Sequence, residues 1–236
     1  MREQYVRFLR EARMNTPLAM TGGVLAMGET DARLLFVLRH HDGGLAAVFQ
    51  MVVAHVTARD ARPFPWSART LERAAALATV VPEGGGPRSI DLGPAETRAS
   101  VARADALDLA PSGRGVVLAQ HCDAFGRMRA EGFMSRMSDA MPNLFAARPR
   151  PAGDLPRERV GGAALEYRLL HHAWPRAGDR LELRSGFGGG DSRVQRIFHW
   201  VLDPETGRPW ATAQAISVSF DLQDRRIIAL TEDQLA

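Results

Sequence analysis

Apolar and polar residues alternate over several short stretches of the chain, the pattern of β-strands with one buried face. The alternation is clearest near the C-terminus, at Ile216, Val218, Phe220 and Leu222. Extended apolar stretches fall into two sets of four, at 4–9, 18–27, 32–40 and 46–56, and at 164–170, 179–187, 193–202 and 211–222. Asp-Gly at 42–43 and Thr-Gly at 206–207 follow the third stretch of each set and indicate hairpin turns. We therefore expect two antiparallel meanders.

The two expected meanders are similar to each other in sequence. Residues 5–57 and 165–222 follow the same order of strands and turns, although few positions are identical. The identical pairs that align without a gap include Leu9/Leu169, Gly28/Gly188, Asp31/Asp191 and Arg33/Arg193. A tandem repeat of one structural unit explains this order.

The region between the meanders contains segments of helical and of loop-like composition. Residues 67–80 favour a helix, whereas 81–96 are rich in Gly and Pro, as linkers are. A short strand is expected at 115–120, and a helix at 129–145 is predicted by the apolar positions Phe133, Met134, Met137, Met141 and Leu144. The fold class is therefore α+β, an antiparallel sheet wrapped around one long helix. We divide the chain into a first unit at 1–80, a linker at 81–112 and a second unit at 113–236.

Composition narrows the classes of function. Hydrophobic residues make up 45% of the chain and charged residues 24%, as in ordinary globular proteins. All 30 basic residues are Arg, but they are interleaved with acidic residues to a net charge of +3 and form no basic run, so we expect no nucleic-acid partner. No apolar run is long enough to span a bilayer, and the N-terminus lacks the features of a signal peptide, which favours a cytoplasmic location.

Cys122 is the sole cysteine, so neither an intrachain disulfide nor a thiolate metal cluster is possible. His171 and His172 are neighbours in an expected strand and should face opposite sides, so they are poor joint ligands of a metal. We expect no metal site and no cofactor.

One segment carries candidate chemistry, the run His-Cys-Asp-Ala-Phe-Gly-Arg-Met at 121–128 with Phe133 and Met134 following. Asp123, Gly126, Phe133 and Met134 resemble the Asp-x-x-Gly-His turn and the following helical pair of the 4-hydroxybenzoyl-CoA thioesterase-like superfamily. The meander at 164–222 is similar to the rest of that fold, called the hotdog fold. The resemblance implies tandem hotdog domains, the first lacking its initial strand and helix, and an acyl-CoA or acyl-carrier-protein substrate.

The same residues suggest a mechanism on chemical grounds. Thioester hydrolysis needs a carboxylate that activates water or attacks the carbonyl, and donors directed at the developing oxyanion. Asp123 can supply the carboxylate, and the backbone N–H groups of Gly126, Arg127 and Met128 can supply the donors if they lie unpaired at the helix N-terminus. A competing interpretation is that Asp123 only caps the helix.

Two departures from the family pattern keep a second function open. Arg127 occupies the His position, and the first unit has no Asp-x-x-Gly segment. Arg127 could hold the phosphate of a carrier or keep Asp123 ionised. The alternative is a catalytically degenerate hotdog protein that binds an acyl thioester or a protein partner. A hotdog hydratase is less favoured, because no His follows Asp123 in the turn.

Neighbouring residues complete the expected site. We assign substrate contacts to His121, Phe125, Glu131, Phe133 and Met134, although His121 also suits a structural role, Glu131 also suits the helix N-terminus, and the Met-rich helix face also suits a core. The first unit offers an apolar sheet face at 4–57 without a helix of its own upstream, which predicts a homo-oligomer with this face at the contact.

Overall fold

The computed structural model describes residues 1–94, 98–146 and 155–230 of the chain, which fold into two compact units. Unit 1 comprises Met1–Leu92 and Glu166–Leu170, and unit 2 comprises Gly93–Leu165 and His171–Ala236. The elements of unit 1 are β1 (Glu3–Phe8), β2 (Leu18–Met27), β3 (Asp31–His40), β4 (Leu45–Ala54) and α1 (Ala68–Ala76).

Unit 2 holds most of the helical residues. Its elements are α2 (Val101–Ala106), β5 (Ala110–Val116), η1 (Ala119–His121), α3 (Glu131–Ala146), η2 (Arg157–Arg159), β7 (Arg180–Gly190), β8 (Gln195–Leu202), β9 (Pro209–Asp221) and β10 (Ile227–Ile228). Strand β6 (Val160–His171) contributes residues to both units.

The two meanders have the same strand order. In unit 1 the order is β2-β3-β4-β1, and the corresponding strands run β7-β8-β9-β6, with β5 added beside β7. Every pairing recorded between these strands is antiparallel. Gly43 and Gly207 adopt φ of 80° and 71° in the turns after β3 and β8, the conformation that glycine tolerates best. The prediction of two antiparallel meanders is confirmed.

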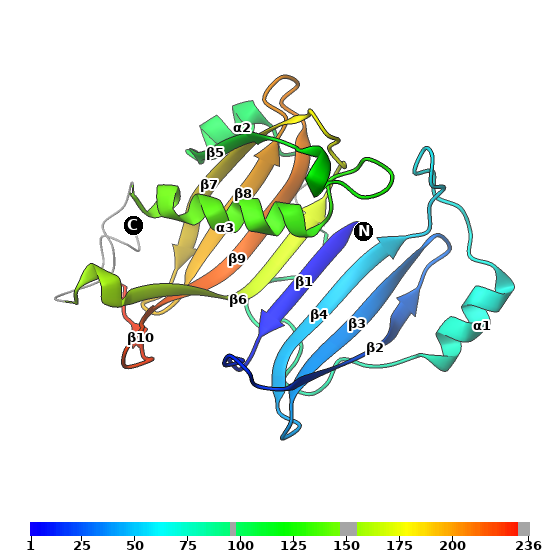
Figure 1. Cartoon of the computed structure of the whole chain (residues 1–236), viewed down its shortest axis with the longest axis horizontal. Coiled ribbons are helices and arrows are strands. Elements are labelled where there is room, and N and C mark those ends of the chain that lie inside the picture. The colour runs from blue at the N-terminus through cyan, green and yellow to red at the C-terminus, as the bar shows by residue number, and fades with distance from the viewer. Residues whose placement is uncertain (95–97, 147–154, 231–236) are drawn as a thin grey trace. The chain divides into compact units, whose positions relative to one another are not determined.

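Unit 2 covers both faces of its sheet with helices (Figure 1). Helix α3 lies across one face and buries Phe133, Met137, Ala140 and Leu144. On the other face, Ala104 of α2 packs with Leu109, Trp200 and Leu202. The predicted helix at 129–145 is confirmed. The strand predicted at 115–120 is misplaced, because β5 occupies Ala110–Val116 and the chain then turns through η1.

Unit 1 covers one sheet face without a helix. Leu35, Val37 and Val48 pack against Val81. Arg7, which pairs with Val48 in the sheet, donates to the Gly86 carbonyl, so the segment after Val81 continues over this face. Buried Glu166 accepts hydrogen bonds from the backbone N–H groups of Arg88, Ser89 and Ile90 and from the Tyr5 hydroxyl.

The region expected to be a linker, at 81–112, is more ordered than predicted. Residues 81–92 pack on the sheet, because buried polar side chains of the sheet form hydrogen bonds with their backbone. Helix α2 and the start of β5 then follow before residue 112.

Candidate active site

Asp123 lies in a tight turn that precedes α3. Its N–H donates to the Arg127 carbonyl (2.8 Å), and the Gly126 N–H donates to the Asp123 carbonyl (3.0 Å). Its carboxylate Oδ1 accepts hydrogen bonds from the N–H groups of Phe125 (2.8 Å) and Arg127 (3.0 Å). Gly126 adopts φ of 74°, so the Asp-x-x-Gly sequence builds the turn from a short acceptor side chain and a residue that tolerates positive φ.

The backbone donors expected to bind an oxyanion are engaged elsewhere. The N–H groups of Gly126 and Arg127 bond to Asp123, and that of Met128 donates to the Pro175 carbonyl (2.8 Å). Helix α3 begins only at Glu131. The expectation that these three groups are unpaired at the helix N-terminus is wrong, because a hairpin-like loop separates Asp123 from the helix. For the same reason Asp123 is not the cap of α3.

A second loop packs against the Asp123 turn. The bond from Met128 to Pro175 and a bridge between Arg127 and Arg176 pair the turn with the residues that follow β6. The Arg176 N–H donates to the Asp179 carboxylate (2.7 Å), which fixes this second loop. The end of β6 is thereby held at the N-terminal end of α3.

His171, the last residue of β6, lies in an aromatic cluster at this place. Its ring stacks on Trp174 (centroids 4.7 Å apart, 15° between planes) and meets the edge of Phe133 (5.0 Å, 70°). The residue is 8% exposed, and neither ring nitrogen has a hydrogen-bond partner among the described residues. Burial lowers the pKa of His171 to about 3, so its imidazole is neutral at physiological pH.

His172 faces the other side of the strand, as the alternation predicted. Its Nε2 is 2.9 Å from the Thr212 hydroxyl, and burial lowers its pKa as well. The sequence therefore separated the two histidines correctly but did not single out His171. The signal was available, since His171 continues the face of β6 that carries buried Leu169.

The remaining predicted site residues differ in exposure. Phe133 and Met128 are fully buried, whereas Phe125 is 56% exposed with the Arg127 guanidinium 5.8 Å from its ring centre. Glu131 is the first residue of α3, suits the positive end of the helix dipole and pairs with Arg129 (2.8 Å).

His121 and Met134 lie at intermediate exposure on η1 and α3. His121 ends the 3₁₀ turn that residues 119–121 form, two residues before Asp123.

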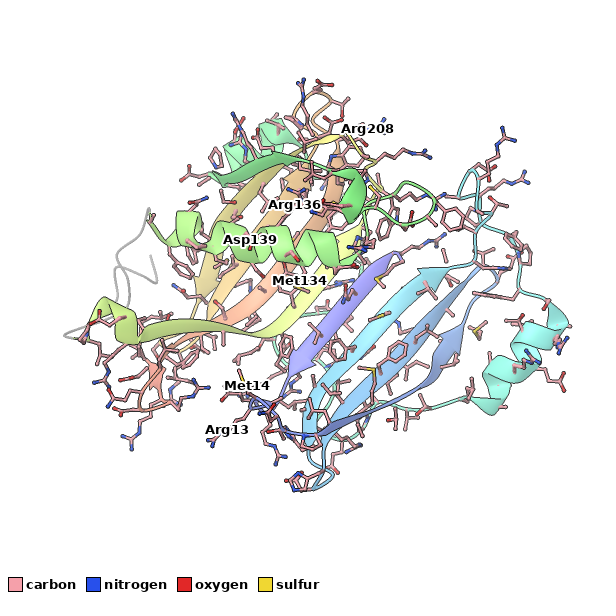
Figure 2. All side chains as sticks on the ribbon, viewed as in Figure 1. Arg13, Met14, Met134, Arg136, Asp139 and Arg208 are labelled. Atoms are coloured by element: carbon pink, nitrogen blue, oxygen red, sulfur yellow. The ribbon has the colours of Figure 1, made fainter. Side chains whose placement is uncertain are left out.

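A groove runs between α3 and the edge strand β5. Arg136 donates to the Val116 carbonyl (2.8 Å) and Asn143 to the Ser112 carbonyl (2.8 Å), which joins helix and strand at two points. Figure 2 shows Met134, Arg136 and Asp139 succeeding one another along the helix. The groove has a volume of roughly 320 Å³ and is lined by Ser112, Gly113, Arg114, Gly115, Arg136, Asp139, Ala140, Asn143, Leu181 and Leu183.

A buried polar chain crosses three strands from the floor of this groove. The Ser112 hydroxyl is 2.7 Å from that of Ser185, which is 2.8 Å from Nδ1 of His199. All three side chains are buried, and burial lowers the pKa of His199 to about 4. Sequence reasoning missed this chain, because its residues are far apart in sequence and adjacent only through strand pairing.

Among residues 1–94, 98–146 and 155–230, no group of three or more His, Cys, Asp or Glu side chains could hold a metal ion. No helix within these residues is long and apolar enough to cross a membrane.

Residues 117–236 match the sequence model of the thioesterase-like superfamily. The chain belongs to this superfamily. The match begins just before the Asp123 turn and includes α3 and the second meander, so the resemblance inferred from the Asp-x-x-Gly motif is confirmed. No curated protein matches the chain in sequence.

Solved structures extend the likeness to both units. The fold is similar to the 12:0-ACP thioesterase from Umbellularia californica, with a TM-score of 0.65 and 11% identity, over 92% of this chain and 71% of that one. An acyl-ACP thioesterase from Bacteroides thetaiotaomicron matches with a TM-score of 0.60 and 10% identity, over 92% of this chain and 74% of that one. At these identities the likeness shows the fold, and it confirms the predicted α+β tandem hotdog architecture.

Proposed function

We propose that this protein hydrolyses an acyl thioester of CoA or of an acyl carrier protein in the cytoplasm, with Asp123 as general base or nucleophile. The observation that carries the proposal is the geometry of Asp123. Its Oδ1 is held by two backbone N–H groups, and its Oδ2 accepts no hydrogen bond from a described residue. An oriented carboxylate with one open oxygen can take a proton from water or attack a carbonyl carbon. Superfamily membership and the fold of two acyl-ACP thioesterases support the choice of substrate.

Replacement of Asp123 by Asn tests the role of the carboxylate. Asn keeps an oxygen for the turn but cannot act as base, so Asp123→Asn should lower hydrolysis across an acyl-CoA panel by at least about 100-fold. Asp191→Asn is a matched control, because Asp191 Oδ1 also accepts two backbone N–H bonds, from Arg193 and Val194. Loss of folding in Asp123→Asn, or unchanged turnover, contradicts the catalytic role.

Arg127 motivates a second candidate function, binding of an acyl thioester without turnover. A fixed cation stands where the family has a His, and its side chain lies at intermediate exposure beside Phe125. Incubation of the protein with acyl-CoA distinguishes the two functions. Hydrolysis releases free CoA thiol, whereas a binding protein returns the intact thioester after saturable binding.

We assign to Arg127 the recognition of a phosphorylated carrier. A guanidinium binds phosphate through paired hydrogen bonds, so Arg127→Ala should raise KM for CoA esters more than KM for short thioesters without a nucleotide. Arg129→Ala is a nearby control, because Arg129 is already paired with Glu131. Equal effects on both substrate classes contradict this role.

We further infer that the protein self-associates through the face of the unit 1 sheet that is opposite to the face packed against Val81 and residues 86–92. Strand pairing places Met20, Leu38 and Ala47 on this face, in line with Phe8. Met20 is 59% and Phe8 47% exposed, and both adjoin partly exposed apolar residues of β3 and β4. Light scattering should give a dimer or larger species for the native protein and a smaller one for Met20→Asp. A stable monomer at micromolar concentration contradicts the inference.

A further inference from the structure

Within the described ranges, the buried side-chain nitrogen and oxygen atoms that have no hydrogen-bond partner are the two ring nitrogens of His171. A buried polar side chain without a hydrogen bond destabilises a protein, and such groups are rare outside functional sites and water-filled cavities. Both ring nitrogens of His171 lack a partner among the described residues, although the residue is 8% exposed. The apolar rings of Trp174 and Phe133 occupy two sides of the imidazole.

The position of His171 relates it to the candidate active site. Phe133, which it touches, belongs to the first turn of α3. Trp174 directly precedes Pro175, whose carbonyl binds the N–H of Met128 in the Asp123 turn. The N–H groups of Ala130 and Glu131 at the start of α3 donate to no described residue. Unpaired backbone donors and an unpaired imidazole are therefore gathered at the end of the helix that the Asp123 turn precedes.

We propose that His171 is a catalytic residue that donates a hydrogen bond from its ring N–H to the carbonyl oxygen of the thioester. The proposal rests on the proposed function. It replaces the backbone groups of Gly126, Arg127 and Met128 as oxyanion donors, since those groups are engaged within the chain. A neutral imidazole is a suitable donor, because it keeps its proton while negative charge develops on the oxygen.

The reaction step balances without any further reagent. Water adds to the carbonyl carbon while Asp123 takes its proton, and the π pair of the C=O bond moves to the oxygen held by His171. The pair then returns, the C–S bond breaks, and the leaving sulfur takes the proton from Asp123. If Asp123 attacks directly, the oxygen of the tetrahedral adduct is held in the same way. His171 keeps its own proton throughout.

Trp174 is the movable cover that gives the substrate access. Its backbone is fixed on both sides, because the Ala173 N–H donates to the Trp210 carbonyl and the Pro175 carbonyl accepts from Met128. Its side chain is half-buried, and its indole N–H donates to no described residue. The ring can therefore rotate away from His171 without breaking a hydrogen bond, which gives the substrate carbonyl a path to the edge of the imidazole that carries the ring N–H.

Three variants test the assignment by kinetics. His171→Phe keeps an aromatic ring between Trp174 and Phe133 but removes both nitrogens, and it should lower kcat by about 100-fold or more with little change in KM. His171→Gln restores an N–H donor and should recover part of the loss. His172→Gln, on the opposite face of the strand, should behave as the native protein. Native turnover in His171→Phe overturns the proposal while leaving the proposed hydrolysis intact.

A binding experiment on the native protein removes dependence on the variants' folding. The probe is an acyl-CoA analogue with CH2 in place of sulfur, which keeps the carbonyl oxygen and cannot be hydrolysed in this way. It should shift the His171 ring-nitrogen resonances in a ¹⁵N NMR spectrum, whereas the S-alkyl thioether of CoA, which lacks the carbonyl, should not. Binding of both probes without this difference overturns the role of His171. A protein that neither binds nor hydrolyses the thioesters overturns the proposed function as well.

Discussion

Unit 1 and unit 2 arrange four meander strands in the same order but stabilise their sheets differently. In unit 2, α3 and α2 pack on opposite faces, and β5 pairs along the edge of β7. In unit 1, residues 86–92 cover one face through buried polar contacts, and the edge of β2 pairs only around Val24 with the residues after α1. The Asp123 turn and the unpaired His171 lie at the N-terminal end of α3. The comparison indicates that the candidate chemistry depends on α3. The described residues of unit 1 include the short helix α1 but no counterpart of α3.

The largest loss of stability should follow truncation of Phe133, the aromatic side chain through which α3 packs on unit 2. Phe133 is fully buried, with 0% of its surface exposed, and its ring contacts His171 and Trp174. Phe133→Ala should lower the unfolding free energy by about 3–5 kcal/mol through lost burial and a cavity. Met134→Ala, on the same helix at intermediate exposure, is the control. Urea denaturation measures both, and equal effects would show that α3 is not anchored through Phe133.

Unit 1 should be most sensitive at its buried carboxylate. Glu166 accepts bonds from Tyr5 and from the backbone of residues 88–90, and its neighbour Arg168 bonds to Glu3 and to the carbonyl of Asp91. Glu166→Gln replaces a charged acceptor by a neutral one, and we expect a loss of about 2–3 kcal/mol. Exposed Glu72 on α1 gives the control Glu72→Gln. Hydrogen exchange at Ser89 and Ile90 should accelerate only in the first variant.

Acid should weaken the protein through unit 2. Burial lowers the pKa of His171 to about 3 and of His199 to about 4, against about 6.5 in the unfolded chain. Below pH 6.5 the unfolded state therefore binds protons that the folded state does not. Each of the two histidines should therefore lower the unfolding free energy progressively as the pH falls from about 6.5 to its folded-state pKa.

Unfolding curves at pH 7 and pH 5 measure this difference. His171→Phe removes one of the two titrating groups and should make the pH dependence of the unfolding free energy shallower. Trp66 reports on unit 1, and Trp174, Trp200 and Trp210 on unit 2. An unchanged dependence in the variant would show that His171 is not buried as a neutral ring.

The smallest expected change in stability is the difference between alanine substitutions at two glycines of the edge strands, Gly23 of β2 and Gly113 of β5. A Cβ on Gly23 of β2 would lie 2.6 Å from Thr79 and 2.8 Å from the Leu77 carbonyl, so Gly23→Ala should push the edge segment away at a cost of about 1–3 kcal/mol. A Cβ on Gly113 of β5 would meet Ala140 and Leu183 at an ordinary 3.7 Å. Gly113→Ala should therefore be neutral or stabilise by up to about 1 kcal/mol. Thermal unfolding of the two variants tests whether the β2 edge is the more tightly packed.

The sequence by itself determined the elements whose pattern is local. Extended apolar stretches located the strands of both meanders, the spacing from Phe133 to Leu144 located α3, and the Gly residues at 43 and 207 located turns. The Asp-x-x-Gly motif led to the correct superfamily. These features could be predicted because each is encoded by residues that are close in sequence and that favour the same local structure.

Only the tertiary structure decided which polar groups are engaged. The donors of Gly126, Arg127 and Met128 are occupied because the turn folds back on itself and meets Pro175, which is distant in sequence. His171 is unpaired because Trp174 and Phe133 pack around it from a separate loop and helix. The Gly- and Pro-rich segment after residue 80 is ordered because Glu166, far along the chain, binds its backbone. Hydrogen bonding and desolvation depend on contacts between distant segments, so local sequence patterns do not determine them.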